Sequence, residues 1–227
     1  MSETRTRNME KRRQRILDAA RAIIIGQGID GLTTRGLAKA AGVTAPTLYN
    51  LIGGKEEILR TMISQGVEKV WARLNFETLE SPLDMAERII EQAAQVVDDD
   101  ADYFRAMILG ADRIIGSYTA QGDLVSTASV AGQRSIEMAA TACAAAISQG
   151  LLRGNLSAAE LGQQMFICYR GPVRDWAYGL ISREETKRRT MRGFYLVMAA
   201  DASPDFRDVL VEKAKSLEVK SPARIAA

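Results

Sequence analysis

Residues 33–55 concentrate side chains that can bind a nucleic-acid duplex. Hydroxyl groups donate hydrogen bonds to phosphate oxygens or base edges, a threonine methyl contacts the thymine methyl, and an asparagine amide pairs with adenine through two hydrogen bonds. Basic side chains add attraction to phosphate. The candidate DNA-contacting residues are Thr33, Thr34, Arg35, Thr44, Ala45, Pro46, Thr47, Tyr49, Asn50 and Lys55.

The pattern around these residues predicts two short helices joined by a tight turn, after a longer first helix. Threonine caps helices, glycine suits the turn, and proline fits the first turn of a helix. Such a unit places its last helix in the major groove of DNA. The expected elements are a helix over about residues 9–26, a second helix capped by Thr33 or Thr34, a turn at Gly42 and a third helix opened by Thr44 or Ala45.

Apolar residues recur every three or four positions along the rest of the chain, which predicts an all-α protein. A long fourth helix is expected from Lys55, whose side chain and free helix-start N–H groups favour a phosphate. We expect a helix-turn-helix DNA-binding domain over 1–54, with a flexible arm at 1–8, and a larger helical effector-binding and dimerisation domain over 55–227. The later helices are expected at about 83–98, 101–117, 123–150, 157–181, 183–200 and 204–217.

Charge is distributed unevenly along the 227 residues. The chain carries a net charge of +2, but residues 1–60 hold 11 basic and 6 acidic side chains, a net +5. A basic end suits contact with phosphates. The chain contains two cysteines and no histidine. Because imidazole is absent both as a general base and as the commonest zinc ligand, we expect no catalytic activity, no bound metal and no other cofactor. No apolar run reaches membrane-spanning length, and a cytoplasmic protein is expected.

Residues 10–60 resemble the DNA-binding domain of the tetracycline-repressor (TetR) family, turn included. The resemblance implies N-terminal helices that bind operator DNA as a dimer, and a helical C-terminal domain that dimerises and usually holds a small ligand. Asn50 stands where the family usually has tyrosine or histidine, Ile52 where it has an aromatic residue, and Pro46 lies one place later than the usual proline. The matching segments are Thr33-Thr34-Arg35, Leu37-Ala38, Ala41-Gly42-Val43-Thr44, Thr47-Leu48-Tyr49 and Gly54-Lys55-Glu56-Glu57-Ile58-Leu59.

The C-terminal helices carry apolar and aromatic residues that could line a small-molecule site, because bundle interiors are common ligand sites. Ordinary core packing is the alternative for each of them. The candidate effector-binding residues are Tyr103, Phe104, Met107, Met138, Met165, Cys168, Tyr169 and Trp176.

The predicted helices at 157–181 and 183–200 are candidates for a homodimer interface. Small residues permit close helix approach and aromatic residues anchor interfaces, although packing within one chain explains the same pattern. In the TetR family the last two long helices form a four-helix contact across a two-fold axis. The residues concerned are Gly162, Phe166, Tyr169, Gly171, Trp176, Gly179, Phe194, Tyr195 and Val197.

These observations predict a transcriptional repressor that binds palindromic double-stranded operator DNA as a homodimer and is released by a small-molecule effector. One alternative is a DNA-binding architectural or adaptor protein without a ligand. Another is a helical enzyme, which would need a base other than histidine.

Overall fold

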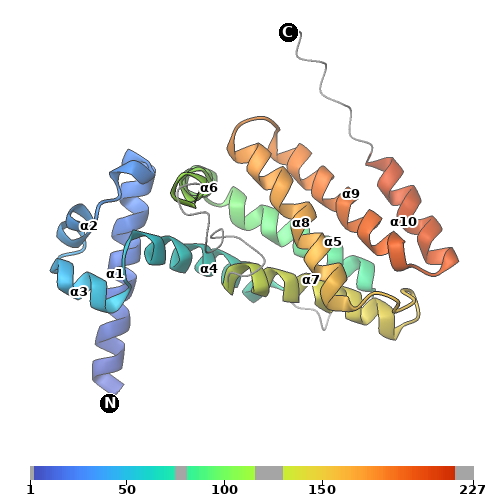
Figure 1. The fold of residues 1–227 in the computed structure, drawn as a ribbon, viewed down its shortest axis with the longest axis horizontal. Coiled ribbons are helices and arrows are strands. Elements are labelled where there is room, and N and C mark those ends of the chain that lie inside the picture. Colours follow the sequence, from blue (N-terminus) through green and yellow to red (C-terminus); the bar gives the residue numbers. More distant parts are fainter. Residues whose placement is uncertain (1–2, 75–80, 116–129, 218–227) are drawn as a thin grey trace, which may run out of the picture. The chain divides into compact units, whose positions relative to one another are not determined.

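The computed structural model describes residues 3–74, 81–115 and 130–217, which form helices joined by turns (Figure 1). Within these ranges strand-type pairing is limited to one isolated bridge between Leu152 and Ala202, so the predicted all-α class is confirmed. No helix in these ranges combines the length and apolar character needed to cross a membrane. The helices are α1 (Glu3–Gln27), α2 (Thr34–Ala40), α3 (Ala45–Leu51), α4 (Lys55–Arg73), α5 (Pro82–Asp98), α6 (Ala101–Ile115), α7 (Val130–Ser148), α8 (Ala158–Ala177), α9 (Arg183–Asp201) and α10 (Pro204–Ser216), with a 3-10 turn at Ile29–Gly31.

Most helix boundaries agree with the predicted ones to within a few residues, and two differ. The first helix begins at Glu3 rather than at about Met9, and the described part of the expected arm at 1–8 is therefore helical. Residues 3–9 contain no glycine or proline to stop a helix. The second difference is that α8 ends at Ala177 rather than at about residue 181, because Gly179 adopts a positive φ of 77°. The expected start of a helix at 123 lies outside the described residues.

The chain divides into two compact units. The N-terminal unit comprises Met1–Gly66 and Asp99–Ala131, and the C-terminal unit comprises Val67–Asp98 and Gly132–Ala227. The N-terminal unit thus includes α6, whose first turn contacts α1. Arg21 forms an ion pair with Asp100 and lies with its guanidinium carbon 4.6 Å from the centre of the Tyr103 ring. A functional boundary at residue 54 stays a prediction.

The core of the N-terminal unit holds α1, α2, α3 and the start of α4 together. Each large apolar side chain removed from water contributes about 1.5–3 kcal/mol to folding. Tyr103 and Met107 of α6 belong to the same core. Its largest fully buried members are Ile16, Ile24, Leu37, Leu48, Ile58 and Leu59.

In the C-terminal unit, α8 packs against α7 on one side and α9 on another. The close approach to α7 requires Gly162, because a Cβ there would lie 2.8 Å from the backbone oxygen of Ile136. A capping box starts α8: the Ser157 hydroxyl accepts a hydrogen bond from the Glu160 N–H (3.2 Å), and the Glu160 carboxylate accepts one from the Ser157 N–H (2.8 Å). A serine followed three residues later by a glutamate is the sequence signature of such a box.

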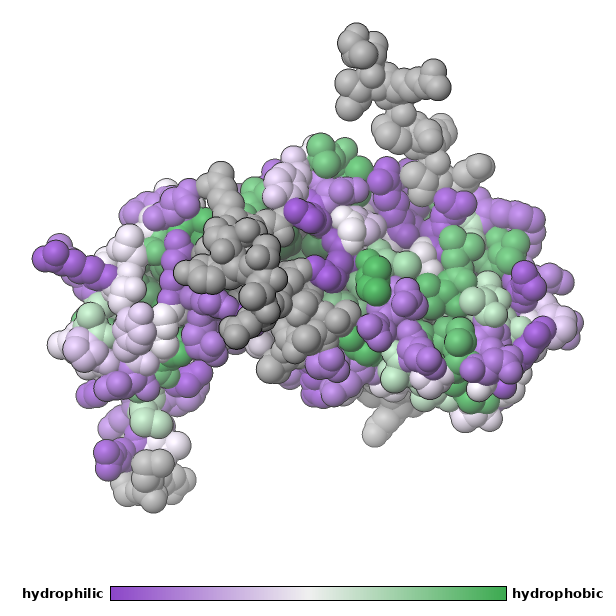
Figure 2. Space-filling model, in the orientation of Figure 1, coloured by the Kyte–Doolittle hydropathy of each residue, from purple (hydrophilic) through white to green (hydrophobic). Residues whose placement is uncertain are grey.

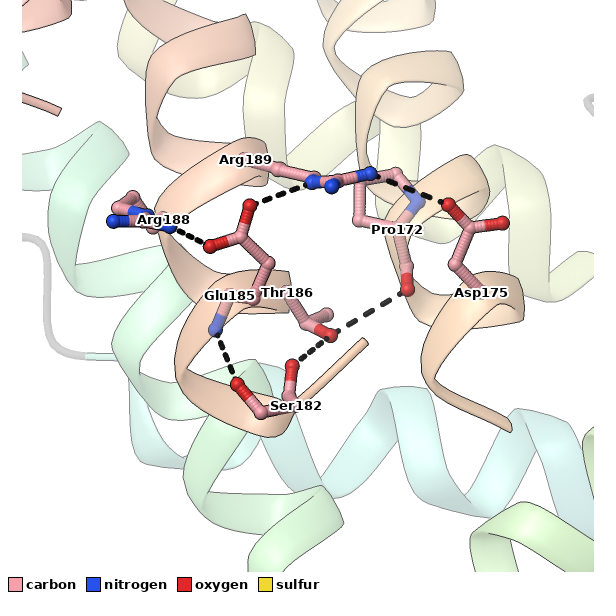
Figure 3. A network of polar contacts seen from close by, with 7 residues as sticks. All are labelled: Pro172, Asp175, Ser182, Glu185, Thr186, Arg188 and Arg189. Carbon is pink, nitrogen blue, oxygen red and sulfur yellow. Dashed lines mark hydrogen bonds and ion pairs between the residues drawn. The ribbon is translucent and has the colours of Figure 1, made fainter. Parts of the chain in front are cut away.

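A polar network joins the first turns of α9 to the end of α8 (Figure 3). The Glu185 carboxylate accepts hydrogen bonds from Arg188 and Arg189, and Arg189 also forms an ion pair with Asp175 of α8 at 3.6 Å. The Thr186 hydroxyl donates to the carbonyl oxygen of Ser182, the N-cap residue of α9, at 2.9 Å, and also lies 3.5 Å from the carbonyl oxygen of Pro172. The network fixes the turn between the two helices.

The aromatic residues that the sequence suggested as dimer anchors are mostly packed inside their own chain. Four of them, Phe166, Trp176, Phe194 and Tyr195, are between 2% and 4% exposed. For these four, packing within one chain, the alternative left open from the sequence, is the correct interpretation. The periodic pattern did not reveal this because α8 and α9 carry apolar side chains on more than one face.

Candidate nucleic-acid interface

Helix α3 has one face in the core of the N-terminal unit and an opposite face that is exposed. Leu48 is fully buried, whereas Tyr49 is 60% exposed and its neighbour Asn50 is also exposed. At the start of the helix, Thr44, Ala45 and Pro46 are exposed and Thr47 is half-buried. The predicted residues of this helix are therefore brought to one outward-facing surface.

Hydrogen bonds at the starts of α2 and α3 determine which threonine hydroxyl hydrogens remain available to a ligand. The Thr33 hydroxyl accepts from the Gly36 N–H at 3.1 Å, and the Thr44 hydroxyl accepts from the Thr47 N–H at 3.3 Å. A hydroxyl that accepts a bond at an N-cap keeps its own hydrogen. The Thr33 hydrogen can therefore go to a phosphate. Thr44 and Thr47 also bond to each other, with their oxygens 2.8 Å apart, which leaves that pair one hydrogen to donate.

The remaining candidates near α2 differ in exposure. Arg35 is exposed, and its guanidinium can reach a phosphate or a base edge. Thr34 is half-buried in the first turn of α2.

Tyr49 lies next to the beginning of α4. A Cβ on Gly54 would be 3.4 Å from the Tyr49 hydroxyl oxygen, so the phenol passes close to that glycine. Gly54 immediately precedes α4, where the first N–H groups have no partner within the helix and the helix dipole attracts anions. The Tyr49 hydroxyl and the start of α4 thus present hydrogen-bond donors in the same place, which suits one phosphate group.

Lys55 has an internal contact that the sequence did not reveal. Its Nζ donates a hydrogen bond of 2.8 Å to the carbonyl oxygen of Ile29, which ties the start of α4 to the 3-10 turn. An ammonium group carries three hydrogens, so two remain for a phosphate. No local signal predicts such a contact between residues 26 positions apart.

Two arginines of α1 cap the helices of the DNA-binding unit. Arg13 donates to the carbonyl oxygen of Leu51, the last residue of α3, and Arg15 donates to that of Ala41 at the end of α2, both at 3.0 Å. A cation beside the free carbonyls at a helix end is stabilising. In the sequence these residues were recognised only as part of the basic charge. In the structure they stabilise the C-terminal ends of α2 and α3.

The candidate effector-binding residues fall in both units. Tyr103 and Met107 are core residues of the N-terminal unit, and Phe104 packs beside them against Gly66. In the C-terminal unit, Met138, Met165 and Trp176 are buried, and Cys168 and Tyr169 are half-buried. Burial raises the pKa of Tyr169 to about 12, so its phenol stays protonated at neutral pH.

The packed three-helix unit with an exposed α3 defines a helix-turn-helix unit, and comparison with known proteins shows what this unit is similar to. Residues 16–62 match the family model described as "Bacterial regulatory proteins, tetR family". The transcriptional regulator SrpR of Pseudomonas putida is 32% identical over 75 residues, which are 27% of this chain and 35% of SrpR. The chain therefore spans about a third of the length of that relative in the match.

Similarity to solved structures extends over most of the chain. A TetR-family transcriptional regulator from a Rhodococcus species superposes with a TM-score of 0.62, at 20% identity, covering 83% of this chain and 99% of the other. A structure described as the molecular basis for control of antibiotic production by bacterial hormones has a TM-score of 0.57, at 20% identity, covering 85% and 98%. Residues 16–62 thus match the DNA-binding model of the TetR family, and the fold of most of the chain is similar to that of TetR-family regulators.

Proposed function

We propose that this protein is a transcriptional repressor that binds palindromic operator DNA as a homodimer and is released by a small-molecule effector. The observation that carries the proposal is the outward face of α3, which is exposed while the opposite face is fixed in the core. A rigid helix with hydroxyl, amide and phenol groups on its free face suits the major groove. The match of residues 16–62 to the TetR family model supports the same function.

The homodimer is proposed to form through the outer faces of α8 and α9. On α8, Ile167 is 46% exposed, and Tyr178, the residue that caps the end of the helix, is 50% exposed. Gly171 and Arg174 lie between them at helical spacing on the same exposed face. On α9, Leu196 is also 50% exposed. In Figure 2 hydrophobic side chains appear among hydrophilic ones over the region of these helices. A second copy would cover this surface and place two α3 helices on half-sites ~34 Å apart, or a multiple of that distance.

The effector is proposed to bind in the C-terminal unit, among Met138, Met165, Cys168, Tyr169 and Trp176. The half-buried phenol of Tyr169 can donate a hydrogen bond, and the thioethers and indole supply an apolar surface. The structural relative concerned with bacterial hormones supports a small-molecule signal. Effector and DNA would then each lower the affinity for the other by the same factor, typically ~5–150-fold.

The three predicted effector residues of α6 are proposed to transmit the effect of effector binding to α3. Tyr103, Phe104 and Met107 pack with the DNA-binding helices, so any shift of α6 acts directly on the core that holds α3.

Selection of bound sequences from a random duplex library tests the DNA-binding proposal. The wild-type protein should enrich an inverted repeat. Asn50→Ala should weaken binding to the enriched duplex by about 5–150-fold if the amide reads a base. Asn155→Ala, at an exposed asparagine of the C-terminal unit, is the matched control and should bind like wild type. Absence of an enriched repeat would contradict the proposal.

A thermal-shift panel of small apolar molecules tests the effector proposal. A ligand that raises the melting temperature should release the enriched duplex, and Tyr169→Ala should abolish both effects. Stabilising ligands that leave DNA affinity unchanged would contradict the release mechanism.

A further inference from the structure

The N-terminal end of α1 extends beyond the core of the N-terminal unit. Ile16 is the first buried residue of the helix and Arg13 is half-buried, whereas every residue from Arg5 to Arg12 is exposed. We call Glu3–Arg12 the overhang. Ten residues of helix span ~15 Å. In Figure 1 this end of α1 reaches past α3, and Figure 2 colours it mainly as hydrophilic and neutral residues.

The overhang is basic, and its basic side chains have no partner within the part of the chain that the structure describes. Among the hydrogen bonds and ion pairs of the described residues, none involves Arg5, Arg7, Lys11 or Arg12. This distinguishes them from Arg13 and Arg15, which cap helices. The overhang carries these four basic residues and two acidic ones, a net +2.

The arrangement of charge is unfavourable for a helix in water. Arg7, Lys11 and Arg15 follow one another at intervals of four residues, and like charges at that spacing repel. No apolar face of the overhang is buried to offset the repulsion, since even Met9 is 40% exposed. A polyanion laid along the overhang would remove the repulsion.

The position of the overhang beside α3 indicates that this polyanion is DNA. Arg13, directly after the overhang, donates its hydrogen bond to the last residue of α3, so the overhang begins beside the C-terminal end of that helix. The major groove is ~12 Å wide, less than the length of the overhang. A helix that starts beside α3 can therefore reach the phosphates that border the groove.

We propose that the overhang is a second DNA-binding element, which binds the phosphate backbone flanking the base pairs that α3 contacts. This inference rests on the DNA-binding function proposed above. The contact is independent of sequence, because basic side chains on phosphates carry no base information. It extends the footprint of each protomer beyond its half-site.

The test replaces all four basic residues of the overhang by glutamine, which keeps helix propensity and removes the charge. The control variant loses four exposed basic residues of the C-terminal unit in the same way, so that net charge changes equally. The substitutions are Arg5→Gln, Arg7→Gln, Lys11→Gln and Arg12→Gln in the overhang variant, and Lys69→Gln, Arg88→Gln, Arg207→Gln and Lys215→Gln in the control.

Affinity for the enriched duplex is measured against salt concentration, with hydroxyl-radical footprinting of both strands. Loss of one phosphate contact per protomer lowers the slope of log K against log salt by ~1.8. We expect this loss, with weaker binding and vanished flanking protection, in the overhang variant alone. Protection at the half-sites should remain.

Three outcomes would overturn the inference. An overhang variant with wild-type slope and footprint, alongside an Asn50→Ala variant that binds weakly, refutes the overhang contact and leaves the proposed function intact. Equal losses in the overhang and control variants show an effect of net charge only. Failure of the wild-type protein to bind any duplex removes the proposed function and this inference together.

Discussion

Gly162→Ala tests how closely α7 and α8 must approach. The added Cβ would lie 2.8 Å from the Ile136 carbonyl oxygen and 2.9 Å from the Ala140 nitrogen, whereas ordinary contacts begin at 3.4 Å. Both neighbours are backbone atoms, so neither can rotate away. The two helices must separate by roughly 0.6 Å to accept the methyl group. A gap of that size removes a quarter to a half of the dispersion energy of each contact between the helices that it opens.

The expected loss of stability follows from two opposing terms. Overpacking of this kind costs about 1–3 kcal/mol, and replacing a helical glycine by alanine returns about 1 kcal/mol. The net destabilisation relative to wild type is therefore about 0–2 kcal/mol, or a fall in melting temperature of up to roughly 8 °C for a chain of this size. The separation also opens the contact between Cys143 and Met165, whose sulfur atoms lie 3.5 Å apart.

Thermal and urea unfolding at one fixed protein concentration measure this loss. Gly171→Ala is the matched control, because it lies on the same helix and a Cβ there meets nothing within 4 Å. It should unfold at or above the wild-type temperature, with association checked by sedimentation because Gly171 is on the proposed dimer surface. A Gly162→Ala protein as stable as the Gly171→Ala protein would refute the close packing of α7 and α8.

Three other expectations address single residues. Arg13→Ala removes the cap on the last turn of α3 and should lower both the free energy of unfolding, by about 1 kcal/mol, and operator affinity; unchanged denaturant and binding curves would contradict this role. Hydrogen bonds from Ser157 lower the pKa of Glu160, so the stability this carboxylate contributes is fully present above its unfolded pKa and is lost as pH falls through its lower folded pKa. The difference in melting temperature between wild type and Glu160→Gln should accordingly shrink on acidification, and a constant difference would argue against it. Burial raises the pKa of Cys143 to about 12 and also raises that of Cys168, which is only half-buried. Because Cys168 is the more accessible thiol, a thiol reagent at pH 8 should label it first, and peptide mass mapping would show this order. Faster labelling of Cys143 would contradict its burial.

Much of the DNA-binding unit could be predicted because its signals are local. Thr33 and Thr44 cap α2 and α3, and Gly42 takes a φ of 64° in the turn between them, as their residue types indicate. Each of these features depends on contacts within about four residues, so a short stretch of sequence contains both partners. The exposed face of α3 follows from the same periodicity, since fixing Leu48 inward leaves Tyr49 and Asn50 outward.

Local patterns failed where several solutions satisfy the same periodicity. The helices α8 and α9 carry apolar residues on more than one face, and the sequence favoured Phe166 and Trp176 as interface residues. Both are buried, and Ile167 and Leu196 are the exposed ones. Which face of a helix is buried depends on the elements that pack against it, and these come from distant parts of the chain.

The sequence by itself determined the helices, their caps and the face that α3 turns outward. The tertiary structure alone decided which partners the basic residues have. Arg13 and Arg15 donate to carbonyl oxygens at helix ends, 38 and 26 positions further along the chain, and Lys55 donates to the carbonyl oxygen of Ile29, 26 positions earlier. It also placed α6 beside α1 through Arg21 and Tyr103. The physical reason is that a charge or an aromatic ring has no preferred partner along the chain, and only folding brings its partner within reach.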